Sequence, residues 1–402
     1  MHTQPAVYKL KGIVQPYAWG GFQFIPNLLG KPETNTPSAE YWLGAHPLNP
    51  AEIDVHGILK KLNQFIEEDK EGVLGHSAAS AFGGLPYLLK LLDVRQMLSI
   101  QVHPGKAAAA AAFNEENQRG IALNATNRNY KDANHKPELM VALGDFWLLH
   151  GFKPAEQLKE TLASIPDFAF LIPVFETKGY KGLYETVMTL PQDEVNDLLQ
   201  PFLQRLLPLY QNGELPKNTE DFWAARAAQT FCKTAAIDRG IFSIYFFNLV
   251  HLKKGEGIYQ PAGLPHAYLE GKNVEIMATS DNVLRAGLTD KHIDIAELMK
   301  HVQFEETIPN VLHDTGGRET VYKSEAAEFS LSRIQLEPSD TIELTTQSGE
   351  IIIALEGKVH YQYSSENGNL QRGEAVFITN GTTVTFTAEA PAQLFRALVP
   401  TG

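Results

Sequence analysis

Ile351-Ile352-Ile353-Ala354-Leu355 is followed at once by the dipeptide Glu356-Gly357, and this unit of a short apolar run and a turn recurs toward the end of the chain. The run 359–363 leads to Asn367-Gly368, and the run 375–379 leads to Asn380-Gly381. Such dipeptides favour the positive φ angles of tight turns. Because short strands at this spacing are typical of sandwiches and jelly rolls, we predict that residues 316–402 form a jelly-roll β domain.

The apolar pattern has a helical period in the middle of the chain. Pro201 interrupts this pattern, and proline inside a helix removes a backbone hydrogen bond, so we predict a break with Pro201 in the first turn of a second helix. We interpret residues 153–236 as an α-helical insertion. The positions with i, i+3, i+4, i+7 spacing are Val195, Leu198, Leu199, Phe202, Leu203, Leu206, Leu207 and Tyr210.

Strand patterns lie on both sides of this insertion. Residues 85–94, 97–102 and 139–149 have the short apolar runs of strands, and so do residues 241–250. A short helix is expected over 107–113. The order along the chain is therefore β, then α, then β, followed by the C-terminal β domain.

Composition excludes several classes of protein. The chain has 402 residues, of which 44% are apolar and 20% are charged, and no run approaches the ~20 apolar residues that span a bilayer. Residues 1–10 lack the features of a signal peptide. Cys232 is the single cysteine, so an internal disulfide is impossible and a reducing, cytoplasmic location is expected. The net charge of −13 argues against nucleic-acid binding, and we expect no membrane partner.

The first candidate site segment is Leu98-Ser99-Ile100-Gln101-Val102-His103-Pro104. If it is a strand, Ser99, Gln101 and His103 share one face and the apolar residues between them share the other. Polar groups buried without partners are costly. This face therefore either lines a cavity or metal site, or is a hydrogen-bonded strand face.

The second segment is Tyr130-Lys131-Asp132-Ala133-Asn134-His135-Lys136-Pro137-Glu138. Pro137 favours an extended conformation for the residue before it. Lys136 and Glu138 then share a face, while His135 takes the opposite one. Glu138 could offer a carboxylate oxygen to a cation, and a surface turn with a salt bridge is the alternative.

The third segment, Gln260-Pro261-Ala262-Gly263-Leu264-Pro265-His266-Ala267-Tyr268, is a turn that leads into a strand. His266 and Tyr268 are expected on one face of that strand. Together with the two earlier segments, it offers two imidazoles and two oxygen donors: His103, His266, Glu138 and Gln101. Zn²⁺ accepts such ligands, and a catalytic zinc site keeps one position open.

The fourth segment, residues 273–291, places Arg285 and Lys291 on a glycine-containing loop of an acidic protein. Guanidinium and ammonium groups suit the capture of a phosphate dianion or the stabilisation of an enediolate. Ordinary surface charge is the alternative.

Together these segments resemble the type I phosphomannose isomerases, which are zinc enzymes that convert mannose 6-phosphate to fructose 6-phosphate. The resemblance rests mainly on residues 130–138 and 266–291, with support from 17–21 and 39–47. Asp290 is a departure, because the family usually has proline there. The resemblance implies a mainly β fold of cupin or jelly-roll domains with an inserted α-helical domain. Residues 1–152 plus 237–315 would form the catalytic cupin-type β domain.

The resemblance also implies a site. One Zn²⁺ per chain would be held by Gln101, His103, Glu138 and His266. Arg285 would be catalytic and would stabilise negative charge, and the proton would move through a cis-enediol. We rank Lys136 first as the proton-transfer base, ahead of His135 and Glu275. The substrate-binding residues would be Trp19, Ser99, Tyr268, Asp281 and Lys291.

Two alternatives share these residue types. An oxidative cupin would also use histidine and carboxylate ligands, usually with Fe(II), and a sugar-phosphate sensor would bind without catalysis. We expect the partner to be a small-molecule sugar phosphate and the protein to be a monomer or a weak homo-oligomer.

Overall fold

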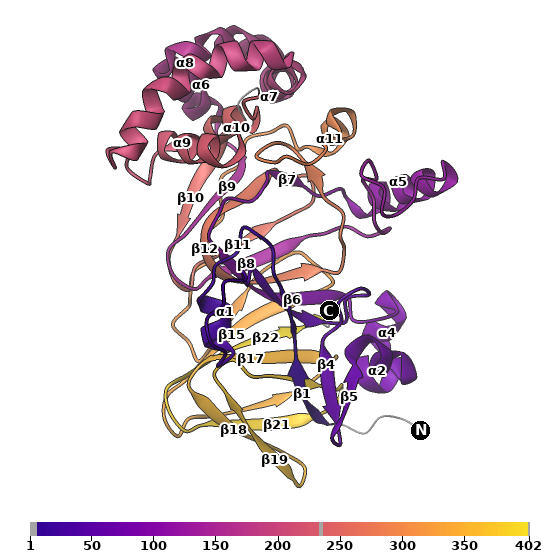
Figure 1. Ribbon diagram of the computed structural model, residues 1–402. Coiled ribbons are helices and arrows are strands. Elements are labelled where there is room, and N and C mark those ends of the chain that lie inside the picture. Colours follow the sequence, from indigo (N-terminus) through magenta and orange to yellow (C-terminus); the bar gives the residue numbers. More distant parts are fainter. Residues whose placement is uncertain (1–5, 233–235, 401–402) are drawn as a thin grey trace.

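Antiparallel strands dominate the computed structural model, which describes residues 6–232 and 236–400 (Figure 1). They form three sheets. The eight-stranded sheet has the order β14 (Glu319–Tyr322), β15 (Ser330–Leu336), β22 (Ala392–Leu398), β17 (Glu350–Glu356), β20 (Ala375–Ile378), β1 (Val7–Lys11), β4 (Glu52–Val55) and β5 (Ile58–Lys61). The four-stranded sheet has the order β16 (Thr341–Thr345), β21 (Thr383–Ala388), β18 (Lys358–Tyr363) and β19 (Glu366–Gln371).

The ten-stranded sheet carries the candidate site. Its main path is β10 (Phe247–Leu252), β9 (Phe146–Phe152), β12 (His266–Ala278), β6 (Tyr87–Val94), β3 (Glu40–Gly44) and β2 (Ile13–Gln15). Four shorter strands pair beside this path: β7 (Gln101–Val102), β8 (Glu138–Ala142), β11 (Gly257–Gln260) and β13 (Leu284–Arg285). The mainly β fold class is confirmed.

Helices gather at one end of the molecule, opposite β18, β19 and β21 (Figure 1). This group consists of α6 (Ala155–Ser164), the 3₁₀ helix η1 (Pro166–Leu171), α7 (Ile172–Thr189), α8 (Gln192–Gln211), α9 (Glu220–Phe231) and α10 (Gly240–Phe246). The remaining helices are α1 (Phe24–Leu28), α2 (Leu62–Glu68), α3 (Lys70–Leu74), α4 (His76–Phe82), α5 (Lys106–Gln118) and α11 (Ile295–His301). Among the described residues, no helix has both the length and the apolar character needed to cross a membrane.

The apolar run 351–355 lies between two cores of the sheet stack. In β17, Ile351 and Ile353 join the core that the eight-stranded sheet shares with the ten-stranded sheet. Ile352 and Ala354 face the other way, into the core shared with the four-stranded sheet. Because both faces of the strand are buried, the run is continuously apolar rather than alternating.

The eight-stranded sheet combines the two ends of the chain. β1 pairs with β20 so that Val7 lies opposite Ile378, and β4 continues the sheet from β1. The predicted boundaries of the three domains stay a prediction. These pairings show that strands from the N-terminal part share a sheet with strands from residues 319–398.

Three local predictions were wrong. Residues 240–246 form helix α10 rather than the start of a strand, because an apolar run does not distinguish a strand from a helix buried on all sides. Asn367-Gly368 lies inside β19, and the turn is at Ser364-Ser365, where Ser364 has a φ of 50°. The predicted strand 139–149 is two strands, β8 and β9, joined through residues 143–145.

The predicted helix break at Pro201 was also wrong, because α8 continues through Pro201 and Pro208. The buried residues of its apolar stripe are Val195, Leu199, Phe202, Leu203 and Leu206. An interior proline costs about 3 kcal/mol, whereas each buried large apolar side chain contributes about 1.5–3 kcal/mol. Continuing the stripe therefore outweighs the lost hydrogen bond.

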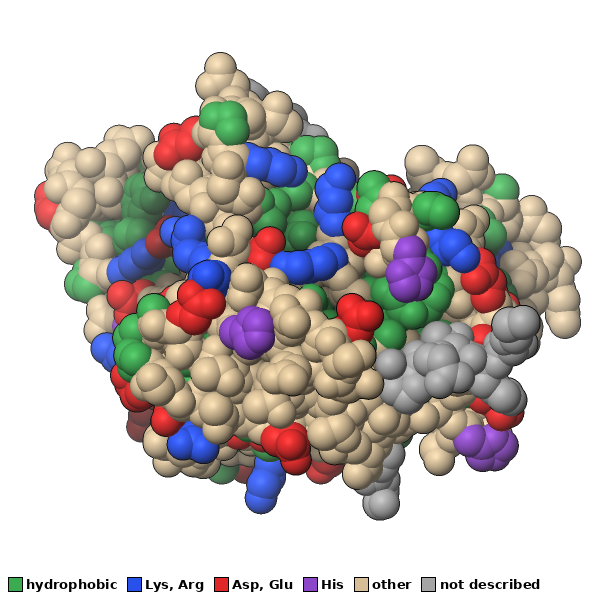
Figure 2. Space-filling view, turned by 90° about the horizontal axis from the view of Figure 1, so that it is seen from below, with side chains coloured by type: hydrophobic (Ala, Val, Ile, Leu, Met, Phe, Trp, Pro, Cys, Tyr) green, Lys and Arg blue, Asp and Glu red, His purple; other side chains and the backbone are tan. Residues whose placement is uncertain are grey.

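Figure 2 shows the face seen from below Figure 1, where Lys and Arg side chains are interspersed with Asp and Glu. Nucleic-acid binding uses a basic patch or stripe. The described part of this face presents mixed charge instead, in line with the net charge of −13.

Candidate metal centre

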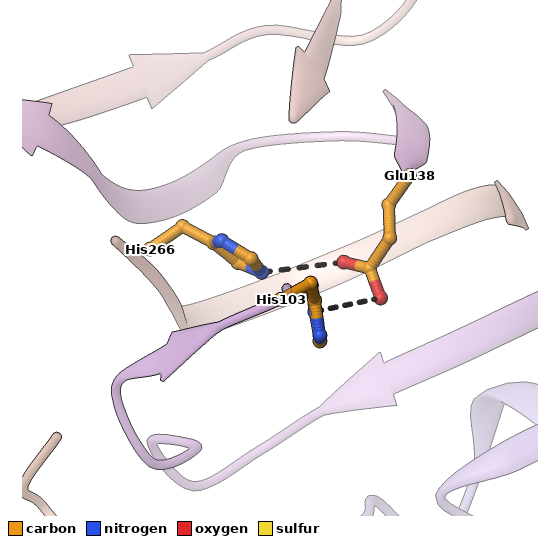
Figure 3. A group of neighbouring side chains, drawn as sticks. All are labelled: His103, Glu138 and His266. Atoms are coloured by element: carbon orange, nitrogen blue, oxygen red, sulfur yellow. Dashed lines mark ion pairs between the residues drawn. The ribbon is translucent and has the colours of Figure 1, made fainter. Parts of the chain in front are cut away.

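Three strands bring together one ligand each. His103 directly follows β7, Glu138 begins β8, and His266 begins β12. One potential ligand atom from each side chain lies within 4.8 Å of the other two. All three side chains are buried, and Figure 3 shows both imidazoles directed at the carboxylate of Glu138.

Backbone carbonyls hold both imidazoles in the orientation that a metal needs. His103 Nδ1 lies 2.8 Å from the carbonyl oxygen of Asn282, and His266 Nδ1 lies 2.9 Å from that of Leu264. Each Nδ1–H therefore donates to a carbonyl, which leaves Nε2 as the atom with a free lone pair. The two Nε2 atoms point at Glu138, at 3.4 Å from Oε1 and 3.3 Å from Oε2.

The charges at this point fit a cation. Burial lowers the pKa of His103 to about 4, so its imidazole is neutral at pH 7. Burial alone would raise the pKa of Glu138, but Lys136 and the histidines hold it well below its usual range. The neutral imidazole of His103 therefore faces a carboxylate, and its Nε2 has no hydrogen-bond donor to accept from. A nitrogen lone pair and a carboxylate that face each other repel unless a cation lies between them. The histidine nitrogens and the carboxylate also match the ligands that Zn²⁺ accepts.

Gln101 joins this set through the strand register. Cross-strand partners in an antiparallel pair present their side chains on the same face. Gln101 of β7 lies opposite His266 of β12 on one side and opposite Arg285 of β13 on the other. The row His266, Gln101 and Arg285 therefore occupies one face of three neighbouring strands.

A cavity of about 50 Å³ opens beside these ligands. Larger cavities lie elsewhere, including one of about 720 Å³ between the end of β6 and the bend in β12, whose lining contains no histidine. Chemistry rather than size therefore identifies the site. The small cavity is lined by Glu40, Lys90, Leu92, Leu98, Gln101, Lys136, Glu138, His266, Tyr268 and Glu275.

Lys136 and Glu275 face this cavity, whereas His135 does not line it. Lys136 Nζ lies 3.0 Å from Glu138 Oε1, as alternation along the extended segment predicts. His135 takes the opposite face, where its Nε2 lies 2.8 Å from Glu328 Oε1. Glu275 accepts a hydrogen bond of 2.7 Å from the hydroxyl of Tyr268, and burial raises its pKa.

The lining of this cavity does not include four of the other predicted residues, namely Trp19, Ser99, Asp281 and Lys291. Trp19 packs beside the core that includes Tyr268 and stacks on Tyr17, with ring centroids 5.9 Å apart. Asp281 is paired with His46 at 3.3 Å. Lys291 is exposed on the loop after β13, and Ser99 is half-buried in the irregular segment before β7. Leu98 lines the cavity, although alternation places it on the opposite face, because only Gln101 and Val102 of this segment form a regular strand.

The sequence analysis did not identify two charged residues that line the cavity, Lys90 and Glu40. Lys90 lies 3.4 Å from Glu40 and 3.3 Å from Glu275. Burial would lower the pKa of Lys90, but the carboxylates of Glu40, Glu275 and Glu138 together raise it further than burial lowers it, so the ammonium stays charged. Lys90 is the one charged residue in Leu85-Pro86-Tyr87-Leu88-Leu89-Lys90-Leu91-Leu92, and a lone lysine inside an apolar strand is a signal that could have identified it.

The chain is similar to known proteins over most of its length. The model of the phosphomannose isomerase type I catalytic domain matches residues 7–155. Mannose-6-phosphate isomerase from Escherichia coli K12 is 35% identical over 379 residues, which cover 92% of this chain and 94% of the relative. The human mannose-6-phosphate isomerase is 32% identical, with 98% of each chain covered.

Solved structures agree with these relatives. A zinc-bound mannose 6-phosphate isomerase superposes with a TM-score of 0.86 at 30% identity, covering 98% of this chain and 100% of the other. The Salmonella typhimurium enzyme bound to fructose 6-phosphate and zinc gives a TM-score of 0.85. Fold and site define a cupin-type β protein with a histidine and carboxylate metal centre. Within that class, the chain belongs to the type I phosphomannose isomerase family.

Proposed function

We propose that this chain is a zinc-dependent aldose–ketose isomerase that interconverts mannose 6-phosphate and fructose 6-phosphate. The observation that carries the proposal is the pair of Nδ1-anchored imidazoles whose Nε2 atoms converge on Glu138 beside Lys136. Gln101, His103, Glu138 and His266 would hold the ion. When bound, Zn²⁺ would polarise the oxygens at C1 and C2 of the open-chain sugar.

The reaction moves one hydrogen between C2 and C1 and shifts the carbonyl the other way, through a cis-enediol. A cavity of about 50 Å³ is smaller than the ~300–1,000 Å³ of usual ligand sites. It therefore accommodates the reacting end of the sugar, and the phosphate would extend outward. Arg285 would stabilise negative charge on the enediolate, and Lys291, with Ser99, would contact the phosphate.

Lys136 is the preferred base, and Glu275 is the alternative inside the cavity. His135 is the weaker candidate, because its ring is paired with Glu328 rather than turned into the cavity. Exchange of the transferred hydrogen with solvent deuterium tests whether Lys136 or Glu275 is the proton-transfer base. Lys136→Ala should suppress this exchange more than Glu275→Gln, and the reverse result would give the role to Glu275. Tyr268 and Asp281 would then support the pocket, with Trp19 at its edge.

A coupled isomerase assay with mannose 6-phosphate tests the function. Chelation should abolish turnover, and added Zn²⁺ should restore it. His266→Ala should lose bound zinc, whereas Arg285→Ala should keep zinc and lose most of its turnover, with a small residual rate. Activity that survives complete metal removal would refute the proposal.

Measurements on the purified protein also distinguish the isomerase from the two alternatives, an oxidative cupin and a sugar-phosphate sensor. An Fe(II) oxidative cupin would contain iron and consume oxygen in the presence of its substrate. A sensor would bind the sugar phosphate without turnover. The retained set of Lys136, Glu275 and Arg285 beside the ligands favours catalysis over sensing.

A further inference from the structure

The backbone that follows Arg285 has an uncommon conformation. Beyond Arg285 the chain stays paired with the residue before β7, because Ala286 N donates to Ile100 O at 2.9 Å and Ile100 N donates to Gly287 O at 3.0 Å. Gly287 then has a φ of 129° and Leu288 has a φ of 53°. A left-handed non-glycine residue costs about 1–3 kcal/mol and persists only where its surroundings impose it.

Asp238 imposes this conformation from the helical end of the molecule. Its Oδ1 accepts hydrogen bonds from Leu288 N at 2.9 Å and from Gly240 N at 2.7 Å. Its Oδ2 accepts a hydrogen bond from Thr289 N at 3.0 Å. One carboxylate therefore holds two consecutive amides of the loop and the first amide of α10.

The backbones of the loop and of α10 are in close contact. A Cβ on Gly287 would lie 2.5 Å from Gly240 Cα, and a Cβ on Gly240 would lie 2.7 Å from Leu288 N. All seven residues of α10 are buried, and Asp238 lies two residues before this helix. The loop and the helix thus meet backbone to backbone, with Asp238 as the link.

We infer that Asp238 is a positioning residue for Arg285, and that it acts through the loop at 287–289. This inference rests on the proposed function, because it concerns where the Arg285 guanidinium stands relative to Gln101 and the substrate. Arg285 lies two residues before Gly287 and opposite Gln101. A shift of about 1 Å in a catalytic group can cost about 100-fold in rate, so a loosened loop should reduce kcat.

The test uses Asp238→Asn, which keeps the shape of the side chain but replaces one acceptor oxygen with a donor. Asp221→Asn is the matched control, because Asp221 accepts a hydrogen bond from Tyr245 at 2.8 Å within the same group of helices. With mannose 6-phosphate as substrate, Asp238→Asn should lower kcat about 10- to 100-fold. Zinc content and zinc affinity should stay at the wild-type level, and the control should keep its kcat.

A double-mutant cycle with Arg285→Ala shows whether the effect passes through Arg285. If it does, Asp238→Asn should lower kcat by less than about twofold in the Arg285→Ala background. An equal loss in both backgrounds would overturn the inference, and so would a normal kcat in Asp238→Asn.

Hydrogen exchange separates this inference from the proposed function, because it does not need turnover. The amides of Leu288 and Thr289 should exchange faster in Asp238→Asn than in the wild type or in Asp221→Asn. Unchanged protection there would refute the positioning role. A wild-type protein that fails to isomerise mannose 6-phosphate would instead refute the proposed function.

Discussion

At the scale of single residues, Asn282 connects two of the ligand segments. Its carbonyl accepts from His103 Nδ1 across a sequence separation of 179 residues. Its side-chain amide donates to Asp132 O and to Asn134 O, both at 2.8 Å, and its Oδ1 accepts from Lys131 N at 2.7 Å. The loop that leads to Glu138 and the carbonyl that orients His103 therefore depend on one buried side chain.

We predict that Asn282→Ala lowers zinc affinity about 10- to 100-fold, the usual cost of losing a group that orients a ligand. Competition with a chromophoric chelator measures this affinity. Asn248→Ala is the matched control, because the Asn248 amide also donates to backbone carbonyls, including those of His150 and Thr307, at 3.0 and 2.9 Å. The control should lose stability and keep its zinc affinity, and an equal loss of affinity in both variants would contradict the prediction.

The alternation of side chains along a strand predicts which residues of one segment share a face. It does not predict contacts between segments that are distant in the sequence. It paired Gln101 with His103 and Lys136 with Glu138, because each pair lies within a few residues of extended chain. The roles of Asn282 and Glu328 depend on contacts between distant segments, which no local pattern encodes. The outward position of His135 follows from the same alternation that places Lys136 inward.

At the scale of elements, α8 shows a conflict between local preference and packing. Pro201 is exposed, whereas the apolar stripe on either side of it is buried. The helix therefore bears the cost of the proline because its stripe packs among the other helices. A reading of local signals alone predicts a break, since the burial that outweighs the proline is a tertiary effect.

We predict that Pro201→Ala raises the free energy of unfolding by about 2 kcal/mol. Restoring the hydrogen bond and relieving the clash return about 3 kcal/mol, and the gain in entropy of the unfolded chain removes up to about 1 kcal/mol. Urea denaturation measures the change, and isomerase activity should stay constant because α8 is remote from the cavity lining. A decrease in stability would show that the helix ends at Pro201 in solution.

At the scale of the whole molecule, the C-terminal strands bring a carboxylate to the edge of the site. Glu328, between β14 and β15, is 2% exposed and lies 2.9 Å from Lys106 Nζ and 2.8 Å from His135 Nε2. Lys106 begins α5, and His135 precedes Lys136. Residues from two ligand-bearing segments thus meet at Glu328, a relationship that the predicted division into domains does not contain.

The pH dependence of stability should reveal this link. Burial alone would raise the pKa of Glu328, but His135 and Lys106 lower it to about 2. Because the folded pKa lies below the unfolded value of 4.5, the stabilisation is fully present above pH 4.5 and is lost as the pH falls toward 2. We therefore predict that Glu328→Gln destabilises the metal-free protein by about 1–3 kcal/mol at pH 7 and by less at pH 3.

Metal-free protein is needed for this measurement, because zinc binding itself depends on pH through the protonation of its ligands. Glu325→Gln is the matched control, since Glu325 lies three residues away and is exposed. The control should change the free energy of unfolding by less than about 0.5 kcal/mol at either pH. If Glu328→Gln lowers the free energy of unfolding equally at pH 7 and pH 3, the prediction is wrong. The contact of Glu328 with His135 and Lys106 then stabilises the protein by packing and not through the charge of Glu328.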